Sequence, residues 1–254
     1  MVCRIIAMAL AASLSCASAL AQAGDALVDQ TRSRPTPLPT LTPEARGDIM
    51  MARKMYREAI EAFQTEAHKS AVVYNKIGIA YHQMQQLASA RKNYEQAVKL
   101  KRDYAEALNN IGTVYYAQKS YRRAIGYYQR ALRLSQSASI YSNLGTAYFA
   151  RKQYEAATKA YQEAFDRDPD VFEHKSNYGT LLQDRNVEER AKFHYYLAKM
   201  YAKSGRNELA LQYVRKALEE GFKERNKLNE DPEFQALRDT PEFKELLALE
   251  PRVL

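Results

Sequence analysis

Apolar and polar residues follow a helical pattern through most of the chain, and the pattern repeats about every 34 residues. Each period holds two amphipathic stretches. The first carries a glycine, and the intervals between successive glycines are 34, 33 and 34 residues for Gly78, Gly112, Gly145 and Gly179. Glycine inside a helix costs about 1 kcal/mol relative to alanine, so its recurrence needs a reason. We expect two antiparallel helices per period that approach closely where the glycine lacks a side chain.

The second stretch of each period carries small and aromatic residues in register with the glycines. These columns are Ala90, Ala124 and Ala157, then Tyr94, Tyr128 and Tyr161, then Ala97, Ala131 and Ala164. Large rings that alternate with small residues can fill the gaps between packed helices. We therefore predict that the abundant tyrosines belong to the core and do not form a cofactor site.

The best period is residues 138–171, which contains Tyr141, Leu144, Gly145, Tyr148, Ala157, Tyr161, Ala164 and Pro169. This arrangement strongly resembles the tetratricopeptide repeat (TPR) family. The resemblance implies an all-α fold, an α-solenoid in which antiparallel helix pairs form a right-handed superhelix. It further implies that the first helices line a concave groove and the second helices form the convex back.

The repeats are predicted to occupy residues 44–221. We place the units at about 44–70, 71–104, 105–137, 138–171, 172–190 and 191–221. The first unit is degenerate, with Gly47, Ala59 and Phe63 at the pattern positions. The unit 172–190 is incomplete and precedes a long helix expected from about Val187 to Lys203. Such a register break changes the curvature of a solenoid and often shapes a pocket.

Residues 222–254 are expected to cap the open end of the stack with short helices, because an uncapped solenoid exposes apolar surface. The segment contains two similar motifs, DPEFQAL and TPEFKEL. Asp231 and Thr240 are expected to be N-caps, each followed by a proline suited to the first helical turn.

The beginning of the chain has the layout of a secretory signal peptide, with a basic residue, a short apolar stretch and a small-residue cleavage motif. We expect cleavage near Ala21 and export to the periplasm or cell envelope. Residues 22–43 form a proline-rich linker. Both cysteines, Cys3 and Cys16, precede the cleavage site. Lipidation of Cys16 is an alternative, but Ser13 stands where a lipobox has leucine.

No arrangement of residues predicts catalysis, a cofactor or a metal site. Nucleotide-binding and hydrolase motifs are absent from the sequence. Asp166, Asp168 and Asp170 resemble the start of a calcium loop, but Val171 replaces the glycine that the loop requires. No metal-binding spacing relates the histidines, which are His68, His82, His174 and His194. We expect a protein that is not an enzyme.

The formal net charge is +8, and the units 71–104 and 105–137 each contribute +4. Most of these cations fall in the expected second helices, on the convex side: Arg91, Lys92, Lys99, Arg122, Arg123, Arg130 and Arg133. A solvated face is one interpretation of this charge. Another is a peripheral or lipid-anchored envelope protein whose basic face contacts anionic membrane or polymer. Export argues against a nucleic-acid partner.

Asparagines recur at one turn of successive first helices, and threonines follow one turn later. Similar asparagine ladders in the family hold the backbone of an extended peptide, for which an amide is both donor and acceptor. The alternative is that these asparagines cap hydrogen bonds within their own repeats. Aromatic residues are expected beside the ladder. The predicted groove residues are Asn75, Asn109, Asn110, Thr113, Tyr116, Asn143, Thr146, Phe149, Asn177, Thr180 and Tyr195.

These features predict a scaffold or adaptor that binds a protein or peptide partner. Chaperone-binding members of the TPR family have a carboxylate clamp, which needs basic groove residues in consecutive repeats. The expected first helices of residues 71–171 do not carry basic residues at such repeated positions. We therefore do not expect recognition of a C-terminal carboxylate.

Overall fold

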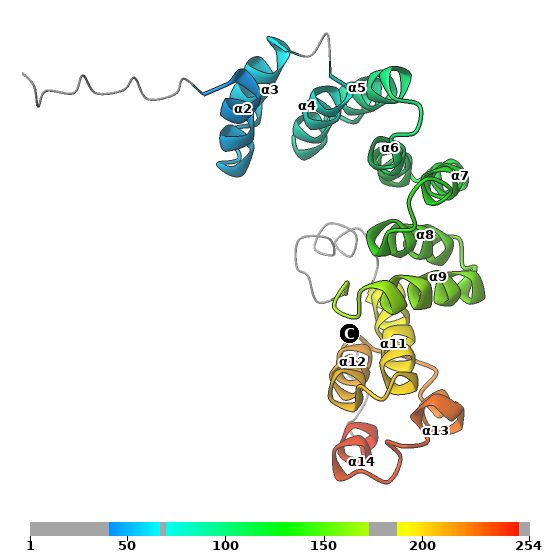
Figure 1. Cartoon of the computed structure of the whole chain (residues 1–254). Helices are drawn as coiled ribbons and strands as arrows, with labels where there is room; N and C mark the ends of the chain where they lie inside the picture. Colours follow the sequence, from blue (N-terminus) through cyan, green and yellow to red (C-terminus); the bar gives the residue numbers. More distant parts are fainter. Residues whose placement is uncertain (1–40, 67–69, 173–186, 249–254) are drawn as a thin grey trace, which may run out of the picture. The chain divides into compact units, whose positions relative to one another are not determined.

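A computed structural model of the chain describes residues 41–66, 70–172 and 187–248 (Figure 1). The described residues form helices and turns and contain no strand. All the helices of the described residues fall within the compact unit Pro43–Leu254. The predicted signal peptide 1–21, and the linker up to residue 40, lie outside the described residues.

The helices form consecutive antiparallel pairs, and each pair packs against the next along the chain. The first helices α4, α6 and α8 also touch in that order. This arrangement confirms the predicted all-α solenoid. The helix bounds are α2 Pro43–Ala52, α3 Tyr56–Gln64, α4 Ala71–Gln83, α5 Leu87–Leu100, α6 Ala105–Ala117, α7 Tyr121–Leu132, α8 Ala138–Ala150, α9 Tyr154–Arg167, α11 Val187–Lys203 and α12 Asn207–Glu219.

The repeated glycines lie where the two helices of a pair come closest. A methyl group added at Gly78 would be 2.5 Å from the ring of Tyr94, and one at Gly112 would be 2.6 Å from the ring of Tyr128. Real side chains essentially never come this close. Gly47 faces Phe63 in the same way, so the degenerate first unit keeps the packing of the others. The glycine and the ring sixteen residues later therefore form one packing unit.

The turn within each helix pair has a left-handed residue, although in most pairs this residue is not glycine. Gln85, Lys119 and Lys152 have φ between 56° and 60°, and Gly205 has φ of 75°. At Lys119 the two N–H groups after the helix donate back to the carbonyls of Tyr116 and Tyr115, both at 2.8 Å. This is a Schellman motif, which pairs the last carbonyls of the first helix and reverses the chain into the second.

The register break does not interrupt the core. Helix α11 spans Val187–Lys203, as predicted, and packs against α9. The ring of Phe193 on α11 stands edge-on to Tyr161 of α9, with 5.5 Å between the ring centroids. One apolar cluster continues from α9 to the C-terminal cap. The incomplete unit 172–190 lies largely outside the described residues.

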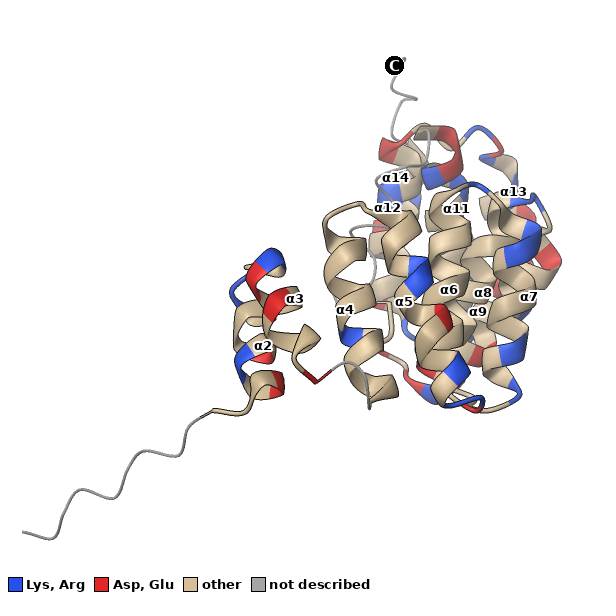
Figure 2. Ribbon diagram, turned by 90° about the horizontal axis from the view of Figure 1, so that it is seen from above, with Lys and Arg blue, Asp and Glu red and all other residues tan. Residues whose placement is uncertain are grey.

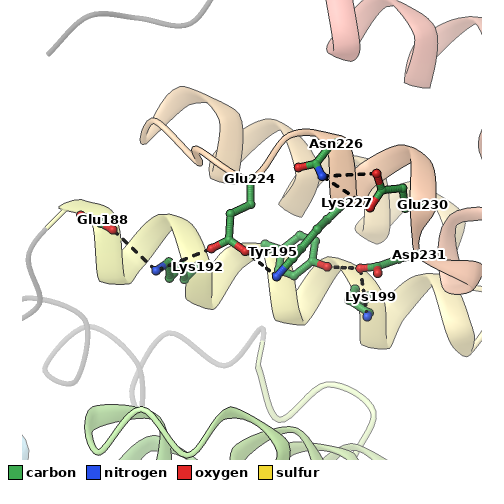
Figure 3. Close-up of polar contacts among 9 residues, drawn as sticks. All are labelled: Glu188, Lys192, Tyr195, Lys199, Glu224, Asn226, Lys227, Glu230 and Asp231. Atoms are coloured by element: carbon green, nitrogen blue, oxygen red, sulfur yellow. Dashed lines mark hydrogen bonds and ion pairs between the residues drawn. The ribbon is translucent and has the colours of Figure 1, made fainter.

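The C-terminal cap differs in part from its prediction. It contains a short helix α13, Asn226–Glu230, then a 3₁₀ turn η2, Pro232–Phe234, and the helix α14, Pro241–Ala248. Thr240 caps α14, because its hydroxyl accepts from the N–H of Phe243 at 3.4 Å. Asp231 occupies the predicted N-cap position, that of η2, but its side chain makes no capping bond. Instead it accepts from Tyr195 and pairs with Lys199 of α11 at 3.0 Å (Figure 3).

Candidate peptide-binding surface

Four asparagines on successive first helices form hydrogen-bonded pairs, and we call these four residues the asparagine ladder. Asn110 of α6 donates from Nδ2 to Oδ1 of Asn75 on α4 at 3.0 Å. Asn143 of α8 donates from Nδ2 to Oδ1 of Asn109 on α6, also at 3.0 Å. Because Asn109 and Asn110 are neighbours on α6, one pair joins this helix to α4 and the other joins it to α8. The ladder therefore links three helix pairs.

These bonds run between units, so the alternative of capping within a repeat does not describe them. The partners are 35 and 34 residues apart in sequence. A side-chain amide offers two N–H donors and two acceptor positions, and each bond uses one. Asn75 is buried, whereas Asn109, Asn110 and Asn143 are half-buried. These three side chains are held in orientation by the bonds and have capacity left for a ligand.

The threonines have an internal role. The hydroxyl of Thr113 accepts from Tyr128 at 3.4 Å, and that of Thr146 accepts from Tyr161 at 3.3 Å. These are the tyrosines that pack against the repeated glycines. Thr113 is half-buried, but Thr146 is only 1% exposed. Thr146 therefore does not belong to the candidate surface, because its buried hydroxyl accepts the hydrogen bond of the Tyr161 phenol.

Of the three aromatic residues predicted beside the ladder, one is partly exposed to solvent and two are buried. Tyr116 is half-buried against Tyr121, with 5.3 Å between their ring centroids. Phe149 is buried between rings of α9 and α11. Tyr195 is buried against Phe222, with stacked rings 4.4 Å apart. The expectation that Phe149 and Tyr195 contact a ligand is therefore wrong in this structure, because both fill the core where α11 packs.

Asn177 and Thr180 of the predicted surface lie outside the described residues. Of the other predicted residues, Asn75 is buried, and the partly exposed ones are Asn109, Asn110, Thr113, Tyr116 and Asn143.

One cation beside the ladder is neutralised by the first unit. Lys76 follows Asn75 on α4, and its ammonium lies 2.7 Å from both Glu44 and Asp48 of α2. Burial alone lowers the pKa of Lys76, but the hydrogen bonds and charges of the two carboxylates outweigh it and raise that pKa. The repeat pattern predicts no role for Lys76, and only the packing of α2 against this region reveals its partners. The ammonium is therefore committed to the link between units.

The phenol of Tyr104 lies near Asn75 at the buried end of the ladder. Burial is the largest cause that raises the pKa of Tyr104, and the nearby carboxylate of Glu106 raises it further. The hydrogen bond with Asn75 acts in the opposite direction. Tyr104 therefore stays a neutral phenol, and this end of the ladder is polar without being charged.

A depression lies at the register break, between α9 and α11. It has a volume of about 400 Å³ and is lined by residues that include Tyr154, Tyr196, Lys199 and Glu233. Tyr154 and Tyr196 stack there, and the ammonium of Lys199 lies 3.3 Å from Glu233. A pocket is expected at such a register break, but the sequence does not predict which residues line it. They come together because α9 packs against α11, which lies further along the chain.

The described residues contain no grouping of three His, Cys, Asp or Glu side chains that could hold a metal ion. None of the described helices is long and apolar enough to cross a bilayer.

Curated relatives cover only parts of the chain. A segment of 93 residues is 30% identical to "Tetratricopeptide repeat domain-containing protein PYG7, chloroplastic" of Arabidopsis thaliana, covering 34% of this chain and 31% of that protein. A segment of 70 residues is 31% identical to "Uncharacterized protein ycf37" of Porphyra purpurea, covering 28% of this chain and 40% of that protein. The chain therefore spans between 31% and 40% of the length of these relatives.

Solved structures that match the chain share little sequence identity with it. MamA 41-end from Desulfovibrio magneticus RS-1 is 19% identical with a TM-score of 0.48, and the match covers 76% of this chain and 93% of that one. YrrB, titled "a TPR protein with an unusual peptide-binding site", is 17% identical with a TM-score of 0.45, and covers 68% and 82% respectively.

Two family profiles match the repeat region. The profile described as "TPR repeat" matches residues 78–119. The profile described as "Tetratricopeptide repeat protein 21 forth ARM domain" matches residues 107–236, which is half of the chain. Together with the glycine and tyrosine packing repeated in successive helix pairs, these matches show that the chain belongs to the tetratricopeptide repeat family.

Proposed function

We propose that this protein is a scaffold or adaptor of the cell envelope that binds an extended segment of a partner protein along the asparagine ladder. Proteins of this family generally serve as non-enzymatic protein–protein interaction scaffolds. The observation that carries the finer proposal is the pair of hydrogen bonds joining α4, α6 and α8 through their asparagines.

The ladder is suited to a peptide backbone because both present donors and acceptors at regular intervals. An amide can accept a backbone N–H and donate to a backbone carbonyl at the same position. The mutual bonds hold the asparagine side chains in place before a ligand arrives, which reduces the entropy lost on binding. A ligand held through its backbone can vary in side chains, so this surface favours recognition of an extended conformation over a particular sequence.

The surface can be tested with a photo-crosslinking amino acid placed at position 106. Glu106 is exposed on α6, one turn before Asn109. The matched control is position 208, an exposed glutamate on the second helix α12. We expect partner crosslinks from position 106 in the native cell envelope and none of the same species from position 208. Equal crosslinking from the two positions would contradict the assignment.

The ladder itself is tested by the double variant Asn109→Ala/Asn143→Ala. It removes both members of one half-buried pair, whereas Asn110→Ala would leave buried Asn75 without its donor and destabilise the fold. Loss of about two ligand hydrogen bonds should weaken partner capture about tenfold or more. Asn93→Ala on α5 is the control, because Asn93 bonds only within its helix, to the carbonyl of Ser89. Unchanged capture by a double variant with a normal thermal melt would remove the ladder from the proposal.

Location in the envelope rests on the signal-like residues at the start of the sequence. Mass spectrometry of the processed N-terminus tests it. We expect the chain to begin at Gln22, after Ala21. A lipid-bearing Cys16 at the N-terminus would instead support the lipid-anchored alternative, and an unprocessed chain would argue against export.

A further inference from the structure

Three arginines gather around two stacked tyrosines on the side of the second helices. The guanidinium carbons of Arg91 on α5 and Arg123 on α7 lie 5.8 and 5.6 Å from the ring centroid of Tyr115. Tyr115 stacks on Tyr127 with 5.3 Å between centroids, and Arg130 lies 5.0 Å from the Tyr127 centroid. We call these five residues the arginine–tyrosine cluster. Stacking on the rings restricts the guanidinium planes and therefore preorganises them.

An open basic depression adjoins the cluster and shares Arg123 with it. The depression has a volume of about 580 Å³ and lies where α7 begins. Its cations are Lys119, Arg122, Arg123 and Arg151, and no acidic residue lines it. The first N–H groups of α7 add a positive dipole end at the same place. The cluster and the depression together form one basic surface.

The cations of this region are rarely paired with acidic side chains. Residues 85–152 contain twelve Lys and Arg but only three Asp and Glu. Among the described residues, Arg91 is the only one of these twelve with an ion pair, at 3.6 Å from Glu95. In Figure 2 both α5 and α7 carry blue segments, which mark Lys and Arg. A net excess of nine charges in 68 residues costs the isolated protein electrostatic free energy.

In the C-terminal third of the chain, by contrast, cations form ion pairs that stabilise the packing of helices. Lys192 pairs with Glu188 at 3.5 Å and with Glu224 at 3.7 Å, and Lys199 pairs with Asp231 (Figure 3). Lys227 also pairs with Glu224. There the cations link α11 to the cap. The contrast indicates that the basic surface of α5 and α7 is arranged for a partner.

The chemistry of the surface favours carboxylates on a protein segment over a lipid bilayer. Its cations are mostly arginines, whose planar fork binds carboxylates with two hydrogen bonds. No exposed large apolar side chain among the described residues lines the depression to insert into a membrane. The recess is also open, which suits an acidic side chain or a turn of chain.

We propose that the basic surface made by Arg91, Arg123, Arg130 and the adjoining depression docks an acidic segment of a partner protein. The three arginines lie on the second helices α5 and α7, and the surface does not include the asparagine ladder of the first helices. It therefore gives the scaffold a second, electrostatic contact, which steers the partner and fixes its orientation.

Fluorescence anisotropy with a labelled peptide of alternating glutamate and serine tests the proposal, using the exported full chain. We expect saturable binding at about 0.05 M salt that weakens strongly at about 0.5 M. Arg123→Gln/Arg130→Gln should weaken it about tenfold. The matched control, Arg57→Gln/Arg215→Gln, removes the same charge at exposed positions on α3 and α12 and should change affinity less than about twofold.

Three further arms decide the outcome. The ladder variant Asn109→Ala/Asn143→Ala should keep its affinity for the acidic peptide, so failure of one proposal does not imply failure of the other. A peptide with glutamine in place of glutamate should not bind. Binding to vesicles of anionic phospholipid without binding to the peptide would overturn the proposal in favour of a membrane. An equal loss in the control variant would also overturn it, because the effect would then follow net charge alone.

Discussion

Gly112→Ala tests the packing that defines the repeat. The new methyl group would lie 2.6 and 2.7 Å from Cε1 and Cδ1 of Tyr128. Tyr128 has no exposed surface, and its hydroxyl donates to Thr113, so the ring has no open space to enter. Relief of the clash must come from separation of α6 and α7 or from a shift of the ring.

Gly126→Ala is the matched control. Gly126 lies inside α7 but faces away from the other helices, and an added Cβ would meet nothing within 4 Å. Both changes replace a helical glycine, and each gains about 1 kcal/mol of helix propensity. Overpacking in a core costs about 1–3 kcal/mol, and only Gly112→Ala incurs it. The two variants should therefore differ by about 1–3 kcal/mol, with Gly126→Ala more stable than the natural chain.

Urea unfolding followed by circular dichroism at 222 nm measures this difference, provided that the slopes agree. A second comparison adds Tyr128→Leu, which removes the ring that the methyl group strikes. Gly112→Ala should cost less in that background, with a coupling of about 0.5–3 kcal/mol. If both glycine variants were stabilised equally, the close approach of α6 and α7 would not be the reason for the repeated glycine.

Two further predictions concern the turns and the cap. Lys152→Gly should raise the free energy of unfolding by about 0.5–1 kcal/mol, since a left-handed φ of 60° strains lysine more than glycine. The control Lys159→Gly, at an exposed position inside the helix α9, should lower the free energy of unfolding instead. Urea unfolding of both variants checks the sign of each change. Acid should weaken the packing of α11 on α12. Burial alone would raise the pKa of Glu220, but its contacts with His194 and Arg190 outweigh burial and lower that pKa below 4.5. The stability from ionised Glu220 is therefore present above pH about 4.5 and lost as the pH falls through the lower folded pKa. Glu220→Gln should unfold more readily at about pH 6 and lose part of its acid sensitivity; an acid dependence equal to that of the natural chain would contradict this.

The repeat and its packing could be predicted because the signal is local and recurrent. The columns that contain Gly112 and Tyr128 lie sixteen residues apart in every good unit, so one rule of close approach explains them all. The helix Val187–Lys203 was also predictable, because its apolar positions follow a single helical period. The unit borders remain predictions, since repeats merge into a continuous stack.

The candidate surface was less predictable, because sequence spacing places a residue on a helix but does not show what the next unit covers. Asn143 and Phe149 share one helix, yet Asn143 bonds across to Asn109 whereas Phe149 is covered by α11. Asp231 stands at an N-cap position as predicted but makes no capping bond, because its carboxylate instead contacts Lys199 and Tyr195 of α11.

The sequence alone determined that this protein is an all-α solenoid of TPR units and that the column Tyr94, Tyr128 and Tyr161 lies in its core. Those features follow from helical periodicity and from the volume that two packed helices leave between them. Only the tertiary structure decided that the asparagines bond between units, that Thr146, Phe149 and Tyr195 are buried, and that Arg91, Arg123 and Arg130 gather on two tyrosines. Each of these depends on how one helix pair is placed against the next. That placement results from many weak contacts between residues distant in sequence, and no local pattern records them.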